Sequence, residues 1–404
     1  MAGPDLTPVD QAIAHLTTQA RASVEAETIR LEDSLGRILA RDYRVPADVP
    51  PADNSAVDGY AVCTSELSNK APLPVSGRIA AGERPGLLKP GTAVRIFTGS
   101  EIPEGADAVI MQEQVTLTDQ CISIDVPVTE GQNIRRQGQD LSRGDLALAR
   151  GCRIRPQEMG LLGSMGIADI EALANLKVAI LTTGDELVDP GQPLEPGQIY
   201  NTNRFTILGL LAKAGCQVVL CETLEDTREA TRKTFERAAA MADLIVTSGG
   251  VSVGEEDHVR AVLEEFGGLS LWRLAIKPGK PLAFGAIDNT PVLGLPGNPA
   301  AVLVTLLIVG MPLIKAMQGR SHCEAKGERI AAGFPVEKSS VRRDYIRARK
   351  TINEGEAVIE AYPNQSSGVL SSACWADGLA VVPENTTVAP GDPLTYYSFA
   401  ELLE

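Results

Sequence analysis

Between residues 178 and 302, short apolar runs alternate with longer stretches in which apolar residues recur at helical spacing. Each apolar run ends in a turn rich in glycine, proline or acidic residues. The four runs are Val178–Thr183, Leu244–Ser248, Leu274–Ile276 and Val292–Leu295. The stretches expected to be helical are Thr202–Lys213, Thr227–Ala242, Asp257–Phe266 and Asn298–Met317. This pattern is typical of an open α/β sheet, which binds its ligand at the carboxyl ends of its strands.

The turns after these runs carry charged side chains. Asp185 and Glu186 follow the first run, an acidic stretch that ends at Asp257 follows the second, and Lys277 and Lys280 of KPGKP follow the third. Carboxylates suit a divalent metal ion and lysines suit an anion, so the pattern indicates chemistry on a phosphate with a metal. The competing interpretation is structural, because such acids also cap helices and surface lysines are usually solvated.

Two further turns are candidates for ligand binding. The loop TSGGVSVGEED contains Gly249 and Gly250, whose N–H groups could cradle an anion. Its spacing matches neither GxGxxG nor GxxxxGK[ST], which disfavours a Rossmann dinucleotide site and a P-loop. The turn LPGNPAA contains Pro296 and Pro299 at a strand end where ligands gather, although proline and glycine also serve as plain turn residues.

Outside this region the pattern changes. Thr7–Gln19 begins with a capping threonine, a proline and an acid, which predicts a helix, and a second short helix is expected over Leu31–Ala40. From residue 42 to about residue 140, short β-rich runs alternate with glycine and proline turns, as in an all-β module. The same texture returns from residue 325 and predicts a small β-barrel or sandwich.

We therefore expect a multidomain protein that combines α/β and β parts. A chain of 404 residues is too long for one typical core. Residues 1–41 and 144–176 are expected to pack together as one discontinuous domain. The remaining parts are an inserted β-rich module over 42–143, an α/β sheet domain over 177–324 and a C-terminal β-barrel over 325–404.

The inserted module carries a second set of candidate residues. The segment DNSAVDGYAV combines acids, an Asn-Ser pair and a Gly-Tyr turn, a density that a solvated loop would not need, and Asp58 is its candidate for catalysis or metal binding. Thr98 and Ser100, in RIFTGSEIPEGADAV, fall in an expected loop and suit hydrogen bonding to an oxyanion.

Composition narrows the function classes. The net charge of −15 argues against nucleic-acid binding, which needs a basic surface. With three histidines, a Ser/His/Asp triad or a multi-histidine zinc site is close to excluded. The seven cysteines are scattered without a CxxC pair, the N-terminus does not resemble a secretion signal, and the apolar stretch Ala300–Met317 is interrupted by polar and turn residues. We therefore expect a soluble protein of a reducing compartment, the cytoplasm.

Seven segments together resemble the MoeA family of molybdopterin molybdenumtransferases, which is related to the E domain of gephyrin. They occur in the order typical of that family, nearly from end to end of the chain. The segments are LEDSLGRILARD, DVPPADNSAVDGYAV, RIFTGSEIPEGADAVIMQE, ILTTGDELV, TSGGVSVGEEDHV, IKPGKPLAFG and LGLPGNPAAV.

The resemblance implies a homodimer of elongated, four-part protomers. It implies a sheet domain with the molybdopterin-binding fold and an active cleft completed by the partner's inserted module. The implied reaction takes adenylylated molybdopterin and molybdate, splits the phosphoanhydride with Mg²⁺, and releases AMP. Other proteins of molybdenum-cofactor biosynthesis are possible partners.

Residue roles follow from the same resemblance. Asp58, Asp140, Glu186, Asp226 and Asp257 are implied as catalytic acids, with Asp58, Glu186 and Asp257 as metal ligands. The implied substrate-binding residues are Thr98, Ser100, Gly249, Gly250, Lys277, Lys280, Pro296, Pro299, Arg347 and Ser367. Two alternatives stay open: another enzyme on the same sheet fold, such as a molybdopterin adenylyltransferase, and a scaffold that has lost the chemistry.

Overall fold

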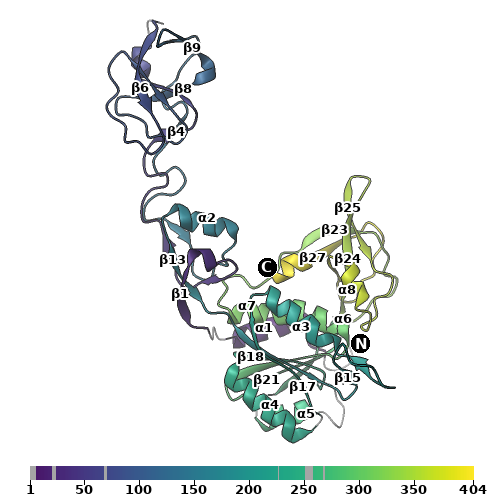
Figure 1. The fold of residues 1–404 in the computed structure, drawn as a ribbon. Helices are drawn as coiled ribbons and strands as arrows, with labels where there is room; N and C mark the ends of the chain where they lie inside the picture. The colour runs from purple at the N-terminus through teal and green to yellow at the C-terminus, as the bar shows by residue number, and fades with distance from the viewer. Residues whose placement is uncertain (1–5, 21–23, 68–70, 226, 251–257, 267–268) are drawn as a thin grey trace.

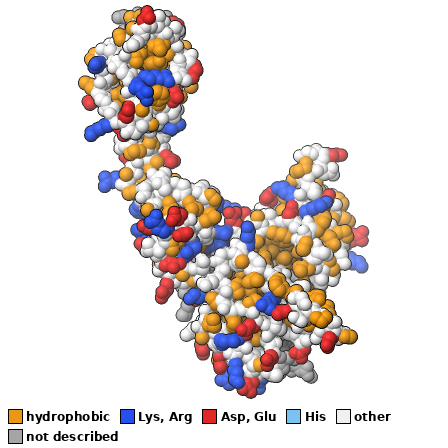
Figure 2. Space-filling view, in the orientation of Figure 1, with side chains coloured by type: hydrophobic (Ala, Val, Ile, Leu, Met, Phe, Trp, Pro, Cys, Tyr) orange, Lys and Arg blue, Asp and Glu red, His pale blue; other side chains and the backbone are white. Residues whose placement is uncertain are grey.

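The computed structural model describes residues 6–20, 24–67, 71–225, 227–250, 258–266 and 269–404. The molecule is elongated (Figure 1), with the inserted module at one end and the sheet domain and C-terminal barrel at the other. On the face drawn in Figure 2, acidic and basic side chains are interspersed over all parts of the molecule. A single basic surface of the kind that binds nucleic acid is not seen on this face.

A small antiparallel sheet joins the two ends. Its order is β1 (Ala26–Arg30), β13 (Asp169–Leu173) and β2 (Ile38–Leu39), and it packs beside α2 (Pro156–Ser164). The helix expected over Leu31–Ala40 is wrong. Only Leu31–Asp33 forms a helical turn, of the 3-10 type, because the chain then pairs through β2 with the end of β13.

Helix α1 (Val9–Gln19) lies away from this small sheet. It was expected to pack with residues 144–176, but its buried side chains Val9, Ala12 and Leu16 belong to the apolar core of the sheet domain. The helix contacts α7 (Met311–Met317). Burial of side chains the size of Val9 and Leu16 stabilises the fold by about 1.5–3 kcal/mol each, which favours the attachment of α1 to this core.

The inserted module is a six-stranded sheet with apolar clusters on both faces. Its strands, in sheet order, are β8 (Ala108–Met111), β5 (Gly59–Val62), β7 (Ala93–Ile96), β6 (Leu73–Ile79), β10 (Cys121–Ile124) and β9 (Val115–Thr118). Two short antiparallel pairs form its stem: β4 (Asn54–Ser55) with β11 (Ile134–Arg135), and β3 (Tyr43–Arg44) with β12 (Leu146–Leu148).

The sheet domain has six strands, four of them parallel. Their order is β17 (Gln217–Leu224), β14 (Lys177–Thr183), β18 (Leu244–Ser248), β22 (Thr290–Leu295), β21 (Pro281–Ile287) and β19 (Ser270–Arg273), and β21 pairs antiparallel with both of its neighbours, β22 and β19. Along β14, Val178 and Ile180 join the core on one face, while Ala179 and Leu181 join the core on the other. Because both faces are buried, the sequence of such a parallel strand is a continuous apolar run rather than an alternation of apolar and polar residues.

Helices cover both faces of this sheet (Figure 1). One face carries α1, α3 (Thr202–Lys213), α6 (Pro299–Thr305) and α7, and the other carries α4 (Arg228–Met241) and α5 (His258–Glu265). A π-helical segment, Leu306–Gly310, links α6 to α7. In the described part of the chain only Pro299–Met317 is long and apolar enough to cross a membrane, and 83% of it is buried inside the protein.

The run Leu274–Ile276 was expected to be a strand of this sheet, and that expectation is wrong. Strand β19 ends at Arg273, and one further bond, from the N–H of Leu274 to the carbonyl of Lys280 at 2.7 Å, continues its pairing. The N–H of Ala275 then donates to the carbonyl of Thr7 at 2.8 Å, outside the sheet. The short strand β20 (Ile276–Lys277) then pairs with β24 (Arg343–Asn353) of the C-terminal domain. Apolar character alone did not reveal that this run belongs to an interdomain contact.

The C-terminal domain is a closed five-stranded barrel. Its strands are β24, β25 (Glu356–Ala361), β23 (Glu328–Ala332), β27 (Pro393–Ser398) and β26 (Gly378–Val382), and β26 closes the ring on β24. Helices α8 (Ser371–Trp375) and α9 (Phe399–Leu403) accompany it. The expected combination of an α/β sheet domain, a β-rich module and a small β-barrel is confirmed.

Candidate active site

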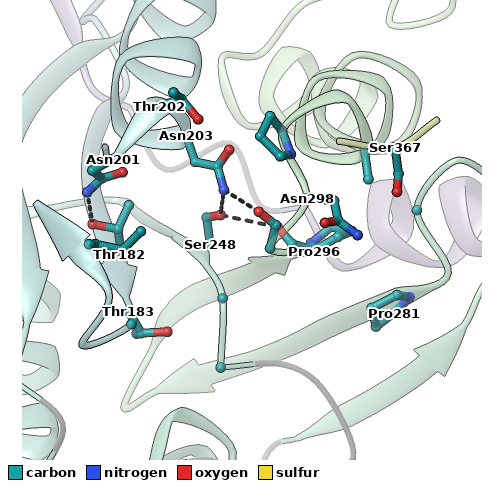
Figure 3. Close-up of a pocket in the computed structure, with 18 of the residues that line it drawn as sticks. Thr182, Thr183, Asn201, Thr202, Asn203, Ser248, Pro281, Pro296, Asn298 and Ser367 are labelled. Atoms are coloured by element: carbon teal, nitrogen blue, oxygen red, sulfur yellow. Dashed lines mark hydrogen bonds between the residues drawn. The ribbon is translucent and has the colours of Figure 1, made fainter. Parts of the chain in front are cut away.

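A pocket of about 960 Å³ opens at the carboxyl ends of β14, β18 and β22 (Figure 3). Strand β14 lies between β17 and β18, the two strands of this sheet that follow it along the chain. The strand order therefore reverses at β14. In open α/β sheets, ligands bind at such a switch point. The pocket is completed from outside the sheet domain by Arg342, Gln365, Ser366 and Ser367.

The turn after β14 brings the acidic side chain of Glu186 back against Gly184. Gly184 has a φ of +141°, and a Cβ atom there would lie 2.6 Å from Oε2 of Glu186. The carboxylate of Glu186 therefore occupies the space that only a glycine leaves free. Asp185 and Glu186 both line the pocket.

The turn after β18 requires glycine for a similar reason. Gly249 has a φ of +87°, and an added Cβ would lie 2.7 Å from both the carbonyl oxygen and the hydroxyl of Thr183. The two strand ends therefore approach more closely than a side chain would allow. Gly249 and Gly250 line the pocket. The loop that follows, with Asp257, lies outside the described residues, as does Asp226.

Asparagine and serine side chains fix the polar wall between α3 and α6 (Figure 3). Nδ2 of Asn203 donates to Oγ of Ser248 at 2.9 Å and to the carbonyl of Gly297 at 2.6 Å, and Oγ of Ser248 donates to the carbonyl of Pro296 at 3.1 Å. Oδ1 of Asn203 is buried and has no partner in the described structure. An unsatisfied buried acceptor is costly, which marks it as a position for a ligand donor.

The opposite wall is basic. Lys277 and Lys280 line the pocket together with Arg342, whose Nη1 donates to the carbonyl of Ile276 at 3.4 Å. Nζ of Lys277 lies 2.6 Å from Oδ2 of Asp344 in β24. In the described part of the chain, neither Lys280 nor Arg342 forms an ion pair. Positive charge is therefore available at this wall for an anion.

The C-terminal barrel shapes one rim of the pocket. The carbonyl of Ser367 accepts from the N–H of Ala300, in the first turn of α6, at 2.9 Å. Arg347, expected to bind substrate, is fully buried and does not line the pocket. Its guanidinium donates to Oγ of Ser372 and to the carbonyls of Tyr345 and Ser366. It therefore holds the rim segment in place from behind.

The inserted module holds Asp58 and Thr98 together. The N–H and the hydroxyl of Thr98 each donate to Oδ1 of Asp58 at 2.8 Å. These hydrogen bonds stabilise the ionised carboxylate and lower the pKa of Asp58 below its usual value. Ser100 is fully buried and donates to the carbonyl of Ile79, so it serves the module's own fold.

Known proteins resemble this chain along its whole length. Family models match at residues 7–166 (MoeA N-terminal region, domain I and II), 179–316 (probable molybdopterin binding domain) and 329–399 (MoeA C-terminal region, domain IV). A molybdopterin molybdenumtransferase of Haemophilus influenzae is 42% identical over 400 residues, which cover 98% of this chain and 99% of that protein. The chain belongs to the MoeA family.

Further members of the MoeA family agree with this assignment. Molybdopterin molybdenumtransferase 2 of Mycobacterium tuberculosis is 32% identical and covers 91% of this chain, which in turn covers 93% of that protein. A crystal structure of a molybdopterin biosynthesis MoeA protein from Pyrococcus horikoshii is 27% identical, with a TM-score of 0.84, and the match covers 98% of this chain and all of the other. The resemblance read from seven sequence segments is confirmed.

The structure brings together only part of the residues that the MoeA resemblance implied. The expected residues that line the pocket are Glu186, Gly249, Gly250, Lys277, Lys280, Pro296, Pro299 and Ser367. Asp58, Thr98 and Ser100 lie on the inserted module. Asp140 lies on its stem, where its N–H donates to the carbonyl of Val49 at 3.0 Å. Within one chain, no described residue of the module lines the pocket.

Sequence reasoning missed several pocket residues. Asn201 and Asn203 sit at the start of α3, and the spacing Asn-Thr-Asn between a short strand and a helix was available as a signal. Arg342 is one of four arginines between residues 342 and 349, a cluster that does not by itself show which of them faces a ligand. The structure separates that cluster, because Arg343 pairs with Asp10 and Arg349 pairs with Glu360, which leaves Arg342 at the pocket.

Proposed function

We propose that this protein transfers molybdenum from molybdate to adenylylated molybdopterin, with cleavage of the phosphoanhydride and release of AMP. Membership of the MoeA family makes the chain an enzyme of molybdenum-cofactor biosynthesis, a transferase that acts on molybdopterin. The adenylylated form of the substrate and the release of AMP are the finer parts of the proposal. We place the reaction in the cytoplasm, in keeping with seven free cysteines.

The separation of charge across the pocket is the observation that carries this proposal. The described lining contains three acids and three strongly basic side chains, together with His258. The acids are Asp185, Glu186 and Glu225, and the bases are Lys277, Lys280 and Arg342. The acids follow β14 and β17, whereas the bases lie at the opposite side of the sheet order, near β21 and the barrel. One half of the pocket therefore suits a cation and the other half suits a phosphate or an oxyanion.

The acidic half fits a magnesium ion that substrate completes. Mg²⁺ takes one or two protein carboxylates together with phosphate oxygens and water, rather than a full protein cage. Asp185 and Glu186 supply such a pair, and the described residues contain no group of three or more histidine, cysteine or acidic ligands. When bound, Mg²⁺ would neutralise the charge that develops on the phosphate oxygens. Asp257 remains a further proposed ligand outside the described residues.

The chain's own residues then have separate tasks. Gly249 and Gly250 line the pocket at a strand end. The N–H of Gly249 donates to the carbonyl of Leu295 at 3.4 Å, so the N–H of Gly250 is the proposed donor to a phosphate oxygen. Lys280 and Arg342 attract the oxyanion and hold it against the substrate. Cleavage of a phosphoanhydride depends on positioning and charge neutralisation more than on a protein nucleophile, so the proposed reaction needs none from this pocket.

We further propose that the protein is a homodimer in which Asp58 and Thr98 of one subunit complete the pocket of the other. The support is that two hydrogen bonds from Thr98 hold the ionised carboxylate of Asp58 in a fixed position. The module that carries both residues stands apart from the sheet domain of its own chain (Figure 1). A carboxylate on an exposed loop does not need two hydrogen bonds for the loop to fold, so this arrangement favours a functional role for Asp58. A partner subunit can bring it to the pocket.

The test is an assay of AMP release from adenylylated molybdopterin in the presence of molybdate and Mg²⁺. We expect AMP and molybdenum-loaded molybdopterin to form in equal amounts, and chelation of Mg²⁺ to stop both. A protein that binds the substrate but releases no AMP would be a scaffold. One that instead forms adenylylated molybdopterin from ATP would be an adenylyltransferase. Either result would refute the proposed reaction.

A further inference from the structure

Asp344 is a buried carboxylate directly behind the basic wall of the pocket. It lies beside Lys277 in the parallel pairing of β20 with β24, and its Oδ2 atom is 2.6 Å from Nζ of Lys277. The side chain of Lys277 is 43% exposed, whereas that of Asp344 is 7% exposed. Lys277 lines the pocket and Asp344 does not. The carboxylate therefore acts on the pocket through the lysine.

The surroundings of Asp344 are unusual for a structural ion pair. Its second oxygen, Oδ1, is buried and has no hydrogen-bond partner in the described structure. The nearby guanidinium of Arg347 donates to Ser372, Tyr345 and Ser366 instead. A buried carboxylate with one oxygen unsatisfied adds little to stability and often costs it. Its position at the back of Lys277 points to a role in the site.

Two physical effects follow from this geometry. An ammonium group has three N–H donors, so a bond to Asp344 leaves two for a ligand and fixes their direction. A lysine held in this way loses less conformational entropy when it binds an anion. At the same time Asp344 cancels the charge of Lys277. The net attraction of the wall for an anion therefore comes from Lys280 and Arg342.

We propose that Lys277 and Asp344 act as one neutral unit that orients the oxyanion, while Lys280 and Arg342 supply the attraction. Asp344 is then a positioning residue, since it touches the lysine and not the substrate. The proposal rests on the proposed function for the identity of the anion, molybdate. It adds a residue, contributed by the barrel, that controls how the anion is held.

The experiment is a binding cycle on the full chain with molybdate as the probe, measured by calorimetry at low salt. Lys277→Gln is expected to weaken molybdate binding about tenfold, because it leaves the carboxylate of Asp344 without its hydrogen-bonded cation beside the pocket. Lys277→Gln/Asp344→Asn removes the pair as a neutral unit and is expected to recover affinity to within about threefold of wild type. AMP release should stay at least about tenfold slow in both variants, because orientation is lost.

A double variant that binds molybdate no better than Lys277→Gln would overturn the proposal, as would a wild-type protein that does not bind molybdate. Glu328→Gln is the matched control, since it breaks another 2.6 Å lysine–carboxylate pair, with Lys350, on the barrel surface. It should change neither affinity nor turnover. Because affinity is measured without turnover, a cycle that closes as expected with no AMP release would refute the proposed reaction and leave the neutral unit standing.

A second measurement avoids substitution of the buried acid. In Lys277→Ala, Asp344 is left facing a space that a small ammonium ion can enter. Ethylammonium should therefore raise the molybdate affinity of Lys277→Ala severalfold, on the order of fivefold. It should not do so for Lys280→Ala, since no described carboxylate pairs with Lys280. An equal response of the two variants, or none in either, would show that Asp344 does not anchor the cation.

Discussion

The pocket of the sheet domain and the Asp58 site of the inserted module hold their acids in different ways. Glu186 is placed by backbone geometry, because Gly184 leaves room for its carboxylate over the turn. Asp58 is placed by side-chain chemistry, through two hydrogen bonds from Thr98. The first acid lines the pocket described above, and the second lines neither that pocket nor the one formed by described residues of the inserted module. In the proposed dimer the second acid would serve the pocket of the partner subunit, so the surroundings of an acid within its own chain do not reveal which pocket it serves.

The sharpest test of this comparison is removal of each charge in turn. Glu186→Gln and Asp58→Asn are each expected to slow AMP release by about 10²–10³-fold, as for the loss of one preorganised group. Both side chains keep their size, so the midpoint of thermal unfolding should move little. Steady-state kinetics and a melting curve measure the two effects. Normal turnover in Asp58→Asn would exclude the module from the reaction.

Mixing the two inactive variants tests whether the site is shared. If subunits exchange at random, half of the dimers combine one variant of each kind. Each such dimer has one site with both acids intact, which predicts a return to about one quarter of wild-type turnover. Refolding the variants separately and then mixing them without exchange is the control. No recovery after exchange would mean that each chain uses its own module.

Molybdate affinity is a second measurement that distinguishes the pocket from the Asp58 site. Lys280→Gln is expected to weaken molybdate binding by roughly tenfold at low ionic strength, and less at high salt, because its charge faces the pocket. Asp58→Asn should leave molybdate affinity of the free protein nearly unchanged if the module acts on the adenylylated substrate. Calorimetry at two salt concentrations checks both. Equal losses would contradict the assignment of separate tasks.

The smallest expected effect is a shift in pH dependence. The hydrogen bonds from Thr98 lower the pKa of Asp58, so the carboxylate stays ionised to lower pH than usual. Stabilisation by these bonds is present above the unfolded-state pKa and is lost as the pH falls through the lower folded-state pKa. Thr98→Val removes one of the two bonds and raises the pKa of Asp58. The acid limb of the rate profile should move to higher pH, whereas an unchanged limb would exclude Asp58 as the group that titrates.

The sequence predicted the sheet domain well because its signals are local. Helix α3 was predicted over Thr202–Lys213 and has those bounds, and β14 and β18 coincide closely with apolar runs. Buried parallel strands must be apolar on both faces, so their runs are visible without tertiary information. The pocket at their ends followed from the general behaviour of such sheets.

What could not be predicted depends on contacts between distant segments. Arg347 matched a motif and was expected at the substrate, but burial turned its guanidinium towards Ser372 and two carbonyls. The position of α1 was missed because any amphipathic helix suits several apolar surfaces equally. Strand β20 was assigned to the wrong sheet because two residues carry no signal of their partner. In each case the deciding neighbour lies far away along the chain.

The place of α1 has a consequence for how this protein can be divided. The sheet domain is not a contiguous piece of chain, because its core includes Val9 and Leu16 and its pocket includes a rim from the barrel. Asp10 on the same helix pairs with Arg343 through two bonds of 2.7 and 2.8 Å, which ties the start of the chain to the barrel. A chimera in which only residues 177–324 came from a relative would combine the sheet domain of one protein with the helix α1 and the barrel of another. Active exchanges between relatives should therefore involve the whole polypeptide, because substitutions at its two ends must remain compatible with each other.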